Sequence, residues 1–433
     1  MWTKLILGAG LSTLALTTAM AQSVNTTTAQ PTLGQRLYDH GVSISLSYTG
    51  EAAANPTGGI RQGAQYAGQV FLGGDFDLAK IAGLTGSSVH IAITQRHGRS
   101  LANDDIGNNT SVQEVWGTQN THLAYLYAEQ KALDDRLDVR LGRVQANIFF
   151  LNSPLYCSFQ TNSACGNPTF VFKDSNFTYF PASAWGGDAT FNFTPAAYVH
   201  AGVYEVSPAD RSINDYGLNW SGHGDTGVDI PAELGYKPNA ATLYAIGGWY
   251  DTSAYADPLN DVNGTPALLA GQPYAKHHDR SGLFARFNLP VDQSGLSMFG
   301  VAMTRLTGQV NEAQYYELGL VQTGTFASRP NDDIGFVVND QEFTPSFIHN
   351  IQAGRQSVGA SPAGIPHREI MMELNYDYKL GSAYTIMPNL QYIINPDQSA
   401  EPTRRTNIPN AFVVGVKFTV DLAQLAGFVA PAQ

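Results

Sequence analysis

Short segments in which apolar and polar side chains alternate dominate the chain. Val42–Tyr48 alternates without a break, and Val89–Thr94, Leu137–Leu141, Ala189–Phe193 and Val414–Val420 repeat the pattern. A period of two residues is typical of β-strands with one apolar face. Turn-forming and polar stretches separate these segments, so the sequence predicts sixteen strands. Their expected spans are 41–52, 66–77, 87–97, 121–130, 135–145, 185–193, 197–206, 228–237, 240–251, 280–289, 294–305, 312–323, 332–341, 367–379, 383–394 and 410–421.

The connections between these strands alternate between short and long. Residues 132–134, 194–196 and 381–382 are short connections, whereas 98–120, 146–184, 207–227, 252–279 and 341–366 are long and polar. A transmembrane β-barrel has short periplasmic turns and longer external loops, with apolar side chains toward lipid and polar ones toward the lumen. A soluble β-sandwich has no reason to alternate in this way. We therefore expect an all-β fold, a 16-stranded antiparallel transmembrane β-barrel. Two connections fit less well: 306–311 is short for an external loop and 324–331 is long for a turn.

The N-terminus has the pattern of a signal peptide over residues 1–21. Met1–Lys4 is basic, Leu5–Leu16 is apolar, and Ala19–Ala21 has the small-residue pattern of a cleavage site. The alternative is a membrane anchor, but a helical span needs about 20 apolar residues. We expect a periplasmic segment over 22–40, with a short helix near its end, a barrel over 41–421 and a tail over 422–433. An exported protein without a long apolar run, yet rich in strands, fits the bacterial outer membrane.

Composition supports a β-rich protein that does not bind nucleic acid. Charged residues make up only 14% of the chain, and it contains 43 Gly, 21 Tyr and 21 Phe. Such a mixture suits many strands joined by turns. The net charge of −12 disfavours a nucleic-acid partner, which requires a basic face. Aromatic side chains near strand ends are expected to form girdles at the lipid interface; they are Trp249, Tyr250, Tyr315, Tyr316, Tyr376, Tyr378, Tyr384 and Tyr392.

The two cysteines, Cys157 and Cys165, lie close together in one long connection. In an oxidising compartment such a pair is expected to form a disulfide, and the alternative is two free thiols. No C-x-x-C redox motif or zinc spacing is present.

Several ordered motifs resemble those of the carbohydrate-selective porins of the OprB family. They run from about residue 31 to 420 and comprise Ser47–Glu51, Thr94–Arg99, Gln113–Gly117, Leu141–Arg143, Ser153–Gln160, Cys165–Pro168, Gly202–Val206, Gly247–Ser253, Arg329–Asp332 and Leu390–Pro396. The resemblance implies a sixteen-stranded outer-membrane barrel that passes monosaccharides such as glucose by passive diffusion. It also implies a constriction with arginines and a glutamate. The chain departs from barrels that end in an aromatic residue, because it continues past Phe418 to Gln433.

The resemblance places the candidate constriction residues in these motifs. Arg96, Arg99 and Glu114 match the constriction region, and Trp116, Arg140 and Arg143 are further candidates. By strand parity, Arg96 and Arg140 face the lumen. Arginine supplies a rigid fork of donors for sugar hydroxyls, and a facing carboxylate supplies acceptors. The alternative is that these charges only solvate the wall of the lumen, as any porin requires.

No motif points to a cofactor or a metal. His90, His122 and His200 do not occur at ligand spacing, and Gly222–Gly227 matches G-x-G-x-x-G but leads into a strand. Asp257–Gly264 is acidic and could hold a cation, although its spacing differs from that of a calcium loop.

The expected partners are small sugars and outer-membrane lipid. A homotrimer is a further expectation, because porins commonly form trimers, but one chain shows no interface. A porin of low selectivity for general small solutes is the main alternative function. An outer-membrane barrel hydrolase is a more remote one, because none of the 10 His is paired with a nucleophile in a known motif.

Overall fold

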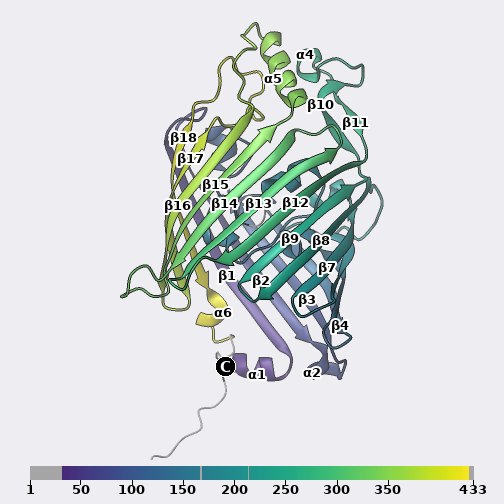
Figure 1. Cartoon of the computed structure of the whole chain (residues 1–433), viewed down its shortest axis with the longest axis vertical. Helices are drawn as coiled ribbons and strands as arrows, with labels where there is room; N and C mark the ends of the chain where they lie inside the picture. The colour runs from purple at the N-terminus through teal and green to yellow at the C-terminus, as the bar shows by residue number, and fades with distance from the viewer. Residues whose placement is uncertain (1–31, 166–167, 213, 429–433) are drawn as a thin grey trace, which may run out of the picture. The chain divides into compact units, whose positions relative to one another are not determined.

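The computed structural model describes residues 32–165, 168–212 and 214–428. The expected signal peptide lies outside these residues. Sixteen strands form a closed barrel in which β1 pairs with both β2 and β18, and every neighbouring pair is antiparallel (Figure 1). The predicted sixteen-stranded barrel is confirmed. A separate two-stranded sheet, β10 with β11, lies within the connection between β9 and β12.

The barrel strands are β1 (Val42–Thr57), β2 (Ala64–Asp77), β3 (Ser87–Gly98), β4 (Thr121–Ala132), β5 (Leu137–Val144), β6 (Ala184–Asn192), β7 (Ala197–Val206), β8 (Gly227–Asn239), β9 (Thr242–Asp251), β12 (Arg280–Pro290), β13 (Leu296–Thr307), β14 (Glu312–Thr323), β15 (Asp333–Phe343), β16 (Arg368–Leu380), β17 (Tyr384–Ile394) and β18 (Ala411–Asp421). The additional sheet consists of β10 (Tyr255–Asp261) and β11 (Tyr274–His277). The helices are α1 (Leu33–Asp39), α2 (Leu78–Ala82), α3 (Thr169–Asp174), α4 (Ala267–Ala270), α5 (Pro345–Ser357) and α6 (Leu422–Leu425), with one π-helical turn at Ala102–Ile106 and 3₁₀ turns at Ala146–Ile148, Tyr156–Ser158 and Pro208–Arg211.

The barrel wall reverses the burial pattern of a soluble protein. On β8, Leu234 is 48% exposed on the outer face, whereas its neighbour Glu233 is 2% exposed and faces the lumen. On β16, Leu374 is likewise 48% exposed and Glu373 is fully buried. Alternation along each strand therefore places apolar side chains outward and many ionisable ones inward, as the period of two predicts for a barrel in lipid.

The two ends of the barrel differ. Short connections such as 133–136, 193–196 and 240–241 share the turn end, where α1, α2 and α6 also lie (Figure 1). Long connections share the other, loop end, beyond which α4, α5, β10 and β11 gather (Figure 1). The connection 308–311 is short for the loop end and 324–332 is long for the turn end, so both expected exceptions are present. Among the described residues no helix is long and apolar enough to cross a membrane.

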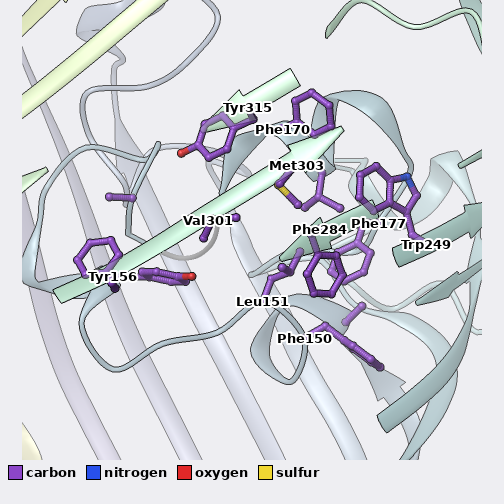
Figure 2. Packing of buried hydrophobic residues seen from close by; sticks show 14 of the residues in the cluster. Phe150, Leu151, Tyr156, Phe170, Phe177, Trp249, Phe284, Val301, Met303 and Tyr315 are labelled. Atoms are coloured by element: carbon purple, nitrogen blue, oxygen red, sulfur yellow. The ribbon is translucent and has the colours of Figure 1, made fainter. Parts of the chain in front are cut away.

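The connection between β5 and β6 folds into the barrel and packs against one side of the wall. Its Phe150, Tyr156 and Phe170 join inward-facing side chains of β9 and β12–β15 in one apolar cluster (Figure 2). Phe170 contacts Trp249 edge-on with 6.1 Å between ring centroids, and Tyr156 contacts Phe299 at 5.2 Å. The expectation of a uniformly polar lumen is therefore wrong on this wall. An apolar inward face is stable here because the loop, rather than water, covers it.

Part of the expected aromatic girdle belongs to this cluster instead. Trp249 is 4% exposed and Tyr315 is fully buried, and both point inward. Tyr250 and Tyr316, the residues that follow them, point outward and are 43% and 46% exposed. Parity along the strand thus separates the two members of each aromatic pair.

A disulfide joins Cys157 and Cys165 within the folded-in connection, as predicted. The pair closes a short loop that contains Phe159, Gln160 and Thr161. In the chain-entropy account, a loop of this length stabilises the folded state by about 2–3 kcal/mol.

Candidate permeation pathway

Two folded-in connections leave only part of the lumen open. The β5–β6 connection covers β12–β15, and the β3–β4 connection packs Leu101, Ile106 and Val112 against inward residues of β1 and β16–β18. The inward carboxylates beneath them, Glu317 and Glu373, are 5% and 0% exposed. Along β2–β5 some inward side chains, such as Asp75 and His90, still contact solvent.

The solvent-accessible wall carries charged and aromatic groups. The side chain of Asp75 is 50% exposed, and its carboxylate accepts a hydrogen bond from His90 Nδ1 at 2.6 Å. The His90 ring stacks on Tyr127 with 4.7 Å between centroids. Glu129 completes this group, 3.7 Å from His90 Nε2. We conclude that the water-filled path follows β2–β5.

Arg96 and Glu114, two of the constriction candidates that the resemblance implies, lie close together at the side of this path. Arg96 projects from β3, is 3% exposed and donates from Nε to Gln69 Oε1 at 2.6 Å. Its Nη2 has no hydrogen-bond partner and lies 3.7 Å from Glu114 Oε1. The guanidinium lies 5.3 Å from the centre of the Phe180 ring, and Phe180 in turn contacts Phe71. A donor, an acceptor and two aromatic rings therefore converge here.

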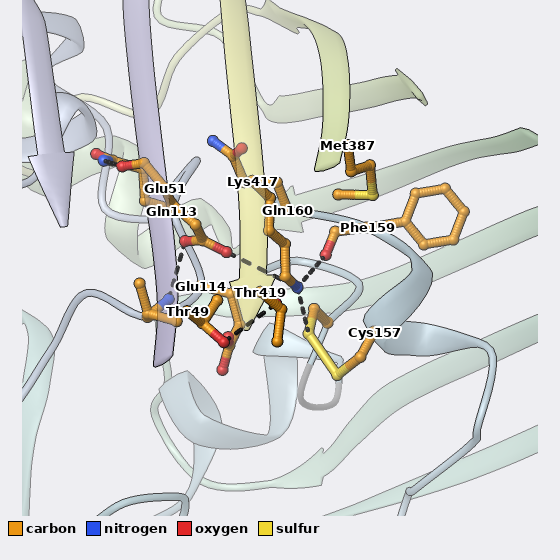
Figure 3. A network of polar contacts seen from close by, with 12 residues as sticks. Thr49, Glu51, Gln113, Glu114, Cys157, Phe159, Gln160, Met387, Lys417 and Thr419 are labelled. Carbon is orange, nitrogen blue, oxygen red and sulfur yellow. Dashed lines mark hydrogen bonds and ion pairs between the residues drawn. A yellow bond between two sulfur atoms is a disulfide. The ribbon is translucent and has the colours of Figure 1, made fainter. Parts of the chain in front are cut away.

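A second network of polar contacts holds the two folded-in connections, of which the β3–β4 connection carries Glu114 (Figure 3). The backbone N–H of Glu114 donates to the Gln160 carbonyl at 3.0 Å, so the two folded-in connections bind each other. Glu51 of β1 accepts the Val115 N–H at 3.0 Å, and Lys417 of β18 donates to the Phe159 carbonyl at 3.0 Å. The position of Glu114 is thus fixed from the wall, through backbone groups.

Arg140 lies deeper, toward the turn end. It donates from Nη1 to Asp188 Oδ1 at 2.7 Å and from Nη2 to Asp138, and its guanidinium lies 4.0 Å from the centre of the Phe149 ring. Together with Lys237, it lines a cavity of about 720 Å³ between the β5–β6 connection and the wall. The inward orientation of Arg140 and Asp138, expected from parity, is confirmed.

The remaining candidates do not join Arg96 and Glu114 in one cluster. Arg99 follows β3, and its side chain is 67% exposed and pairs with Asp104 at 2.7 Å. Trp116 is half-buried in the β3–β4 connection.

Arg143 faces out of the barrel, because it pairs in register with the outward Trp185 of β6. Its guanidinium donates to Asp210 at 3.0 Å and to the Asn219 carbonyl, and so it anchors the β7–β8 connection. Burial raises the pKa of Asp210, although the Arg143 guanidinium acts in the opposite direction. Placing Arg143 at the constriction was wrong. On β5 Gly142 occupies the inward position, so the next residue, Arg143, points outward.

Sequence reasoning missed Phe71, Phe180 and Lys417. Parity alone could have placed Phe71 inward, next to Gln69 on β2. Phe180 lies in a loop, where no periodicity exists to locate it. The acidic segment Asp257–Gly264 has its carboxylates engaged: Asp257 accepts two backbone N–H groups and His277, and Asp261 accepts the N–H of Thr265. Among the described residues no group of three or more acidic, histidine or cysteine side chains forms a metal site.

A closed sixteen-stranded antiparallel barrel with inward-folded loops and a water-accessible polar path defines an outer-membrane porin. Residues 61–422 match the family described as "Carbohydrate-selective porin, OprB family". The chain belongs to that family, and it is a porin of the bacterial outer membrane.

Two curated relatives and one solved structure illustrate the similarity. Porin B of Pseudomonas aeruginosa is 31% identical over 408 residues, which cover 88% of this chain and 87% of that protein. The putative porin QuiX of Acinetobacter baylyi is 29% identical over 418 residues, covering 89% and 90%. The high-pH structure of Pseudomonas putida OprB matches with a TM-score of 0.81 and 31% identity, covering 89% of this chain and 95% of that one.

Proposed function

We propose that the protein conducts small neutral carbohydrates, such as glucose and other monosaccharides, by passive diffusion and without catalysing a reaction. The observation that carries the proposal is the convergence of Arg96, Glu114, Phe71 and Phe180 beside the open path. Arg96 is buried and its Nη2 has no hydrogen-bond partner among the described residues, Glu114 is a partly exposed acceptor, and the rings offer flat apolar faces. A sugar presents both hydroxyl groups and apolar C–H faces, so it can exchange its hydration for these contacts.

Charge supports a neutral solute at this point. Arg96 and Glu114 lie 3.7 Å apart and offset each other, so the pair forms neither a strong anion nor a strong cation site. The description of the family, carbohydrate-selective porins, points in the same direction. Assembly as a homotrimer is a further prediction, which cross-linking of the purified protein checks.

The test compares sugar flux with ion conductance in the same variants. Arg96→Ala and Glu114→Gln are reconstituted into liposomes for swelling with glucose, and into planar bilayers for conductance in KCl. We expect glucose flux to fall several-fold while KCl conductance changes less. Arg368→Ala is the matched control, because its side chain is 49% exposed and lies outside the path.

The second candidate is a porin of low selectivity for general small solutes. The net positive lining of the deeper cavity, with Lys131, Arg140, Lys237 and Arg286 against Asp135 and Asp138, is the observation that favours it. Equal changes of sugar flux and conductance in both variants would support this reading and contradict a sugar filter.

A further inference from the structure

A second cavity lies at the loop end, apart from the Arg96–Glu114 pair. It has a volume of about 530 Å³ and is enclosed by α5, by β10 and its flanking residues, and by the β3–β4 and β17–β18 connections. Of these elements, α5 and β10 lie beyond the loop end of the barrel (Figure 1). The volume falls within the range of about 300–1,000 Å³ that is typical of small-molecule sites. We call this space the outer cavity.

The polar groups of the outer cavity are amides rather than charges. Asn103, Asn109 and Asn311 line it, and among the described residues none of their side-chain amides has a hydrogen-bond partner. Each amide offers two N–H donors and one carbonyl acceptor. The hydroxyl of Tyr274 accepts from Asn350 Nδ2 at 3.0 Å, which leaves its own O–H free to donate. The cavity therefore presents a mixed set of donors and acceptors to a ligand.

The ionisable group at this site is already satisfied. Asp257 lines the cavity, but its Oδ1 accepts the N–H groups of Leu259 and Asn260, and its Oδ2 lies 2.7 Å from His277 Nε2. It is the one acidic or basic side chain among the residues that line the cavity. The deeper lumen cavity, in contrast, is lined by several Lys, Arg and Asp side chains. An anionic solute would find no cationic side chain in the outer cavity, and the one carboxylate is already engaged, so the lining favours a neutral solute.

Apolar surfaces complete the lining. Leu268 of α4 and Phe347 and Ile351 of α5 line the cavity, next to Pro258 and Pro402. Amides beside flat apolar surfaces match the two faces of a pyranose ring, which carries hydroxyls at its edge and C–H groups on its faces. A pocket lined by apolar groups with a few convergent polar ones is the common form of a small-molecule site.

Hydrogen bonds between the connections hold the outer cavity open before any ligand binds. Asn350 Oδ1 accepts the N–H of Leu268 at 3.2 Å, which joins α5 to α4. The N–H of Asn109 donates to Asp397 Oδ2 at 2.8 Å, which joins the β3–β4 and β17–β18 connections. Arg355 of α5 donates to Asn407 at 2.6 Å. A cavity fixed in this way loses less conformational entropy when it binds a ligand.

We propose that the outer cavity is a docking site for a neutral mono- or disaccharide, which binds there before it reaches the Arg96–Glu114 pair. The proposal rests on the proposed function, because it assumes that neutral sugars are the solutes of this porin. It adds a site of different chemistry at the mouth of the barrel, lined by amides and without a cationic side chain. Its effect is to raise the local concentration of sugar above the path.

The test fills the outer cavity without touching its hydrogen bonds. Ala400 is exposed and lines the cavity, so Ala400→Trp places a large side chain inside it. Ala363→Trp is the matched control: Ala363 is also exposed at the loop end but does not line the cavity. Binding of maltose and glucose to the detergent-solubilised full-length protein is measured by saturation-transfer NMR titration, and gluconate serves as the charged probe. The heat-dependent gel mobility of both variants confirms that the barrel is folded.

We expect maltose affinity to fall at least ten-fold in Ala400→Trp and to be unchanged in Ala363→Trp, with gluconate bound more weakly than glucose by the unsubstituted protein. Unchanged maltose affinity in Ala400→Trp, or tighter binding of gluconate than of glucose, would overturn the docking site. Liposome swelling separates the two proposals. If the unsubstituted protein passes sugar but Ala400→Trp binds maltose with unchanged affinity, the outer site alone is refuted. If Ala400→Trp abolishes maltose binding but the unsubstituted protein passes no sugar, the proposed function alone is refuted.

Discussion

Replacing Glu373 with glutamine should release the disulfide-bonded tip of the β5–β6 connection from the wall. The Glu373 carboxylate accepts the Gln160 N–H at 2.9 Å, the Thr161 N–H at 2.7 Å and Asn375 Nδ2 at 2.8 Å. All of these partners are donors, so the site requires an acceptor on both oxygens. Glu373→Gln keeps the shape but turns one oxygen into an NH₂ group, which faces a donor and leaves a loop N–H unsatisfied.

The expected loss follows from the number of bonds affected. Hydrogen bonds to a charged group contribute about 1.5–3 kcal/mol each, against about 0.5–1.5 kcal/mol for neutral ones. Weakening one loop bond and losing another therefore costs about 3 kcal/mol in the docking of residues 160–161. At 1.4 kcal/mol per factor of ten, the undocked population of this tip rises by about 100-fold.

Hydrogen exchange followed by mass spectrometry measures this population directly, because the amides of Gln160 and Thr161 exchange when the tip opens. Peptides that cover both residues should exchange about 100-fold faster in Glu373→Gln. Asp377→Asn is the matched control, because Asp377 lies on the same strand and face and makes no hydrogen bond or ion pair with the loop. Equal protection of the two amides in Glu373→Gln and in the unsubstituted protein would refute the role of Glu373 as the anchor of the tip.

Three further predictions concern other parts of the molecule. Phe150→Ala should weaken docking of the β5–β6 connection by about 3–5 kcal/mol, since Phe150 is fully buried and stacks on His200 at 3.7 Å. The looser connection should raise the single-channel conductance, and unchanged conductance would contradict this. Arg140→Ala leaves Asp138 and Asp188 without their cation, so the reversal potential in a KCl gradient should shift toward cation selectivity, and a shift toward anions would exclude this role. In the turn at 324–332, the Arg329 hydrogen bonds lower the pKa of Asp332 to about 2, so its stabilising effect is complete above about pH 4 and is lost as the pH falls toward 2. Asp332→Asn should remove this part of the acid sensitivity of heat-dependent gel mobility, and parallel pH curves for both proteins would rule it out.

The barrel itself could be predicted because its determinants are local. Strand 312–323 has the predicted bounds in the structure, and β1 continues to Thr57 rather than ending near residue 52. Alternation requires only that one face meets lipid, and each strand carries that signal independently. The two exceptional connections were visible as well, since their lengths can be read directly from the chain.

Elements of the long connections were harder to predict. β10 and β11 have only 7 and 4 residues, and Pro258 interrupts the first, so no alternation marks them. Helix α5 did carry a signal: Thr344 caps it by accepting the Phe347 N–H, and Pro345 follows at the first helical position. A Thr–Pro pair before a run without further proline is a helix start that sequence reasoning could have used.

Residues of the candidate site could be predicted only where they lie on a strand and face the lumen. Arg96 and Arg140 were placed on the inward face by parity, because alternation along a strand determines which face each side chain takes. Parity places Glu373 in the same way, yet Glu373 is fully buried and holds a loop, whereas the side chain of Asp75 is 50% exposed. An inward carboxylate looks the same in sequence in both cases. What distinguishes them is a long-range contact with residues 160–161, more than 200 positions away along the chain.

This distinction determines where solute can pass. The barrel wall is polar at many inward positions around its circumference, so polarity alone would allow a path along any side. The apolar residues Phe150, Tyr156 and Phe170 commit the β5–β6 connection to the wall of β9 and β12–β15, since apolar side chains must be buried against one another. The β3–β4 connection packs against the adjoining wall, and β2–β5 stay partly uncovered. The open part of the lumen is therefore set by the apolar residues of the loops, which determine whether an inward charged side chain is buried, as Glu373 is, or remains beside water, as Asp75 does.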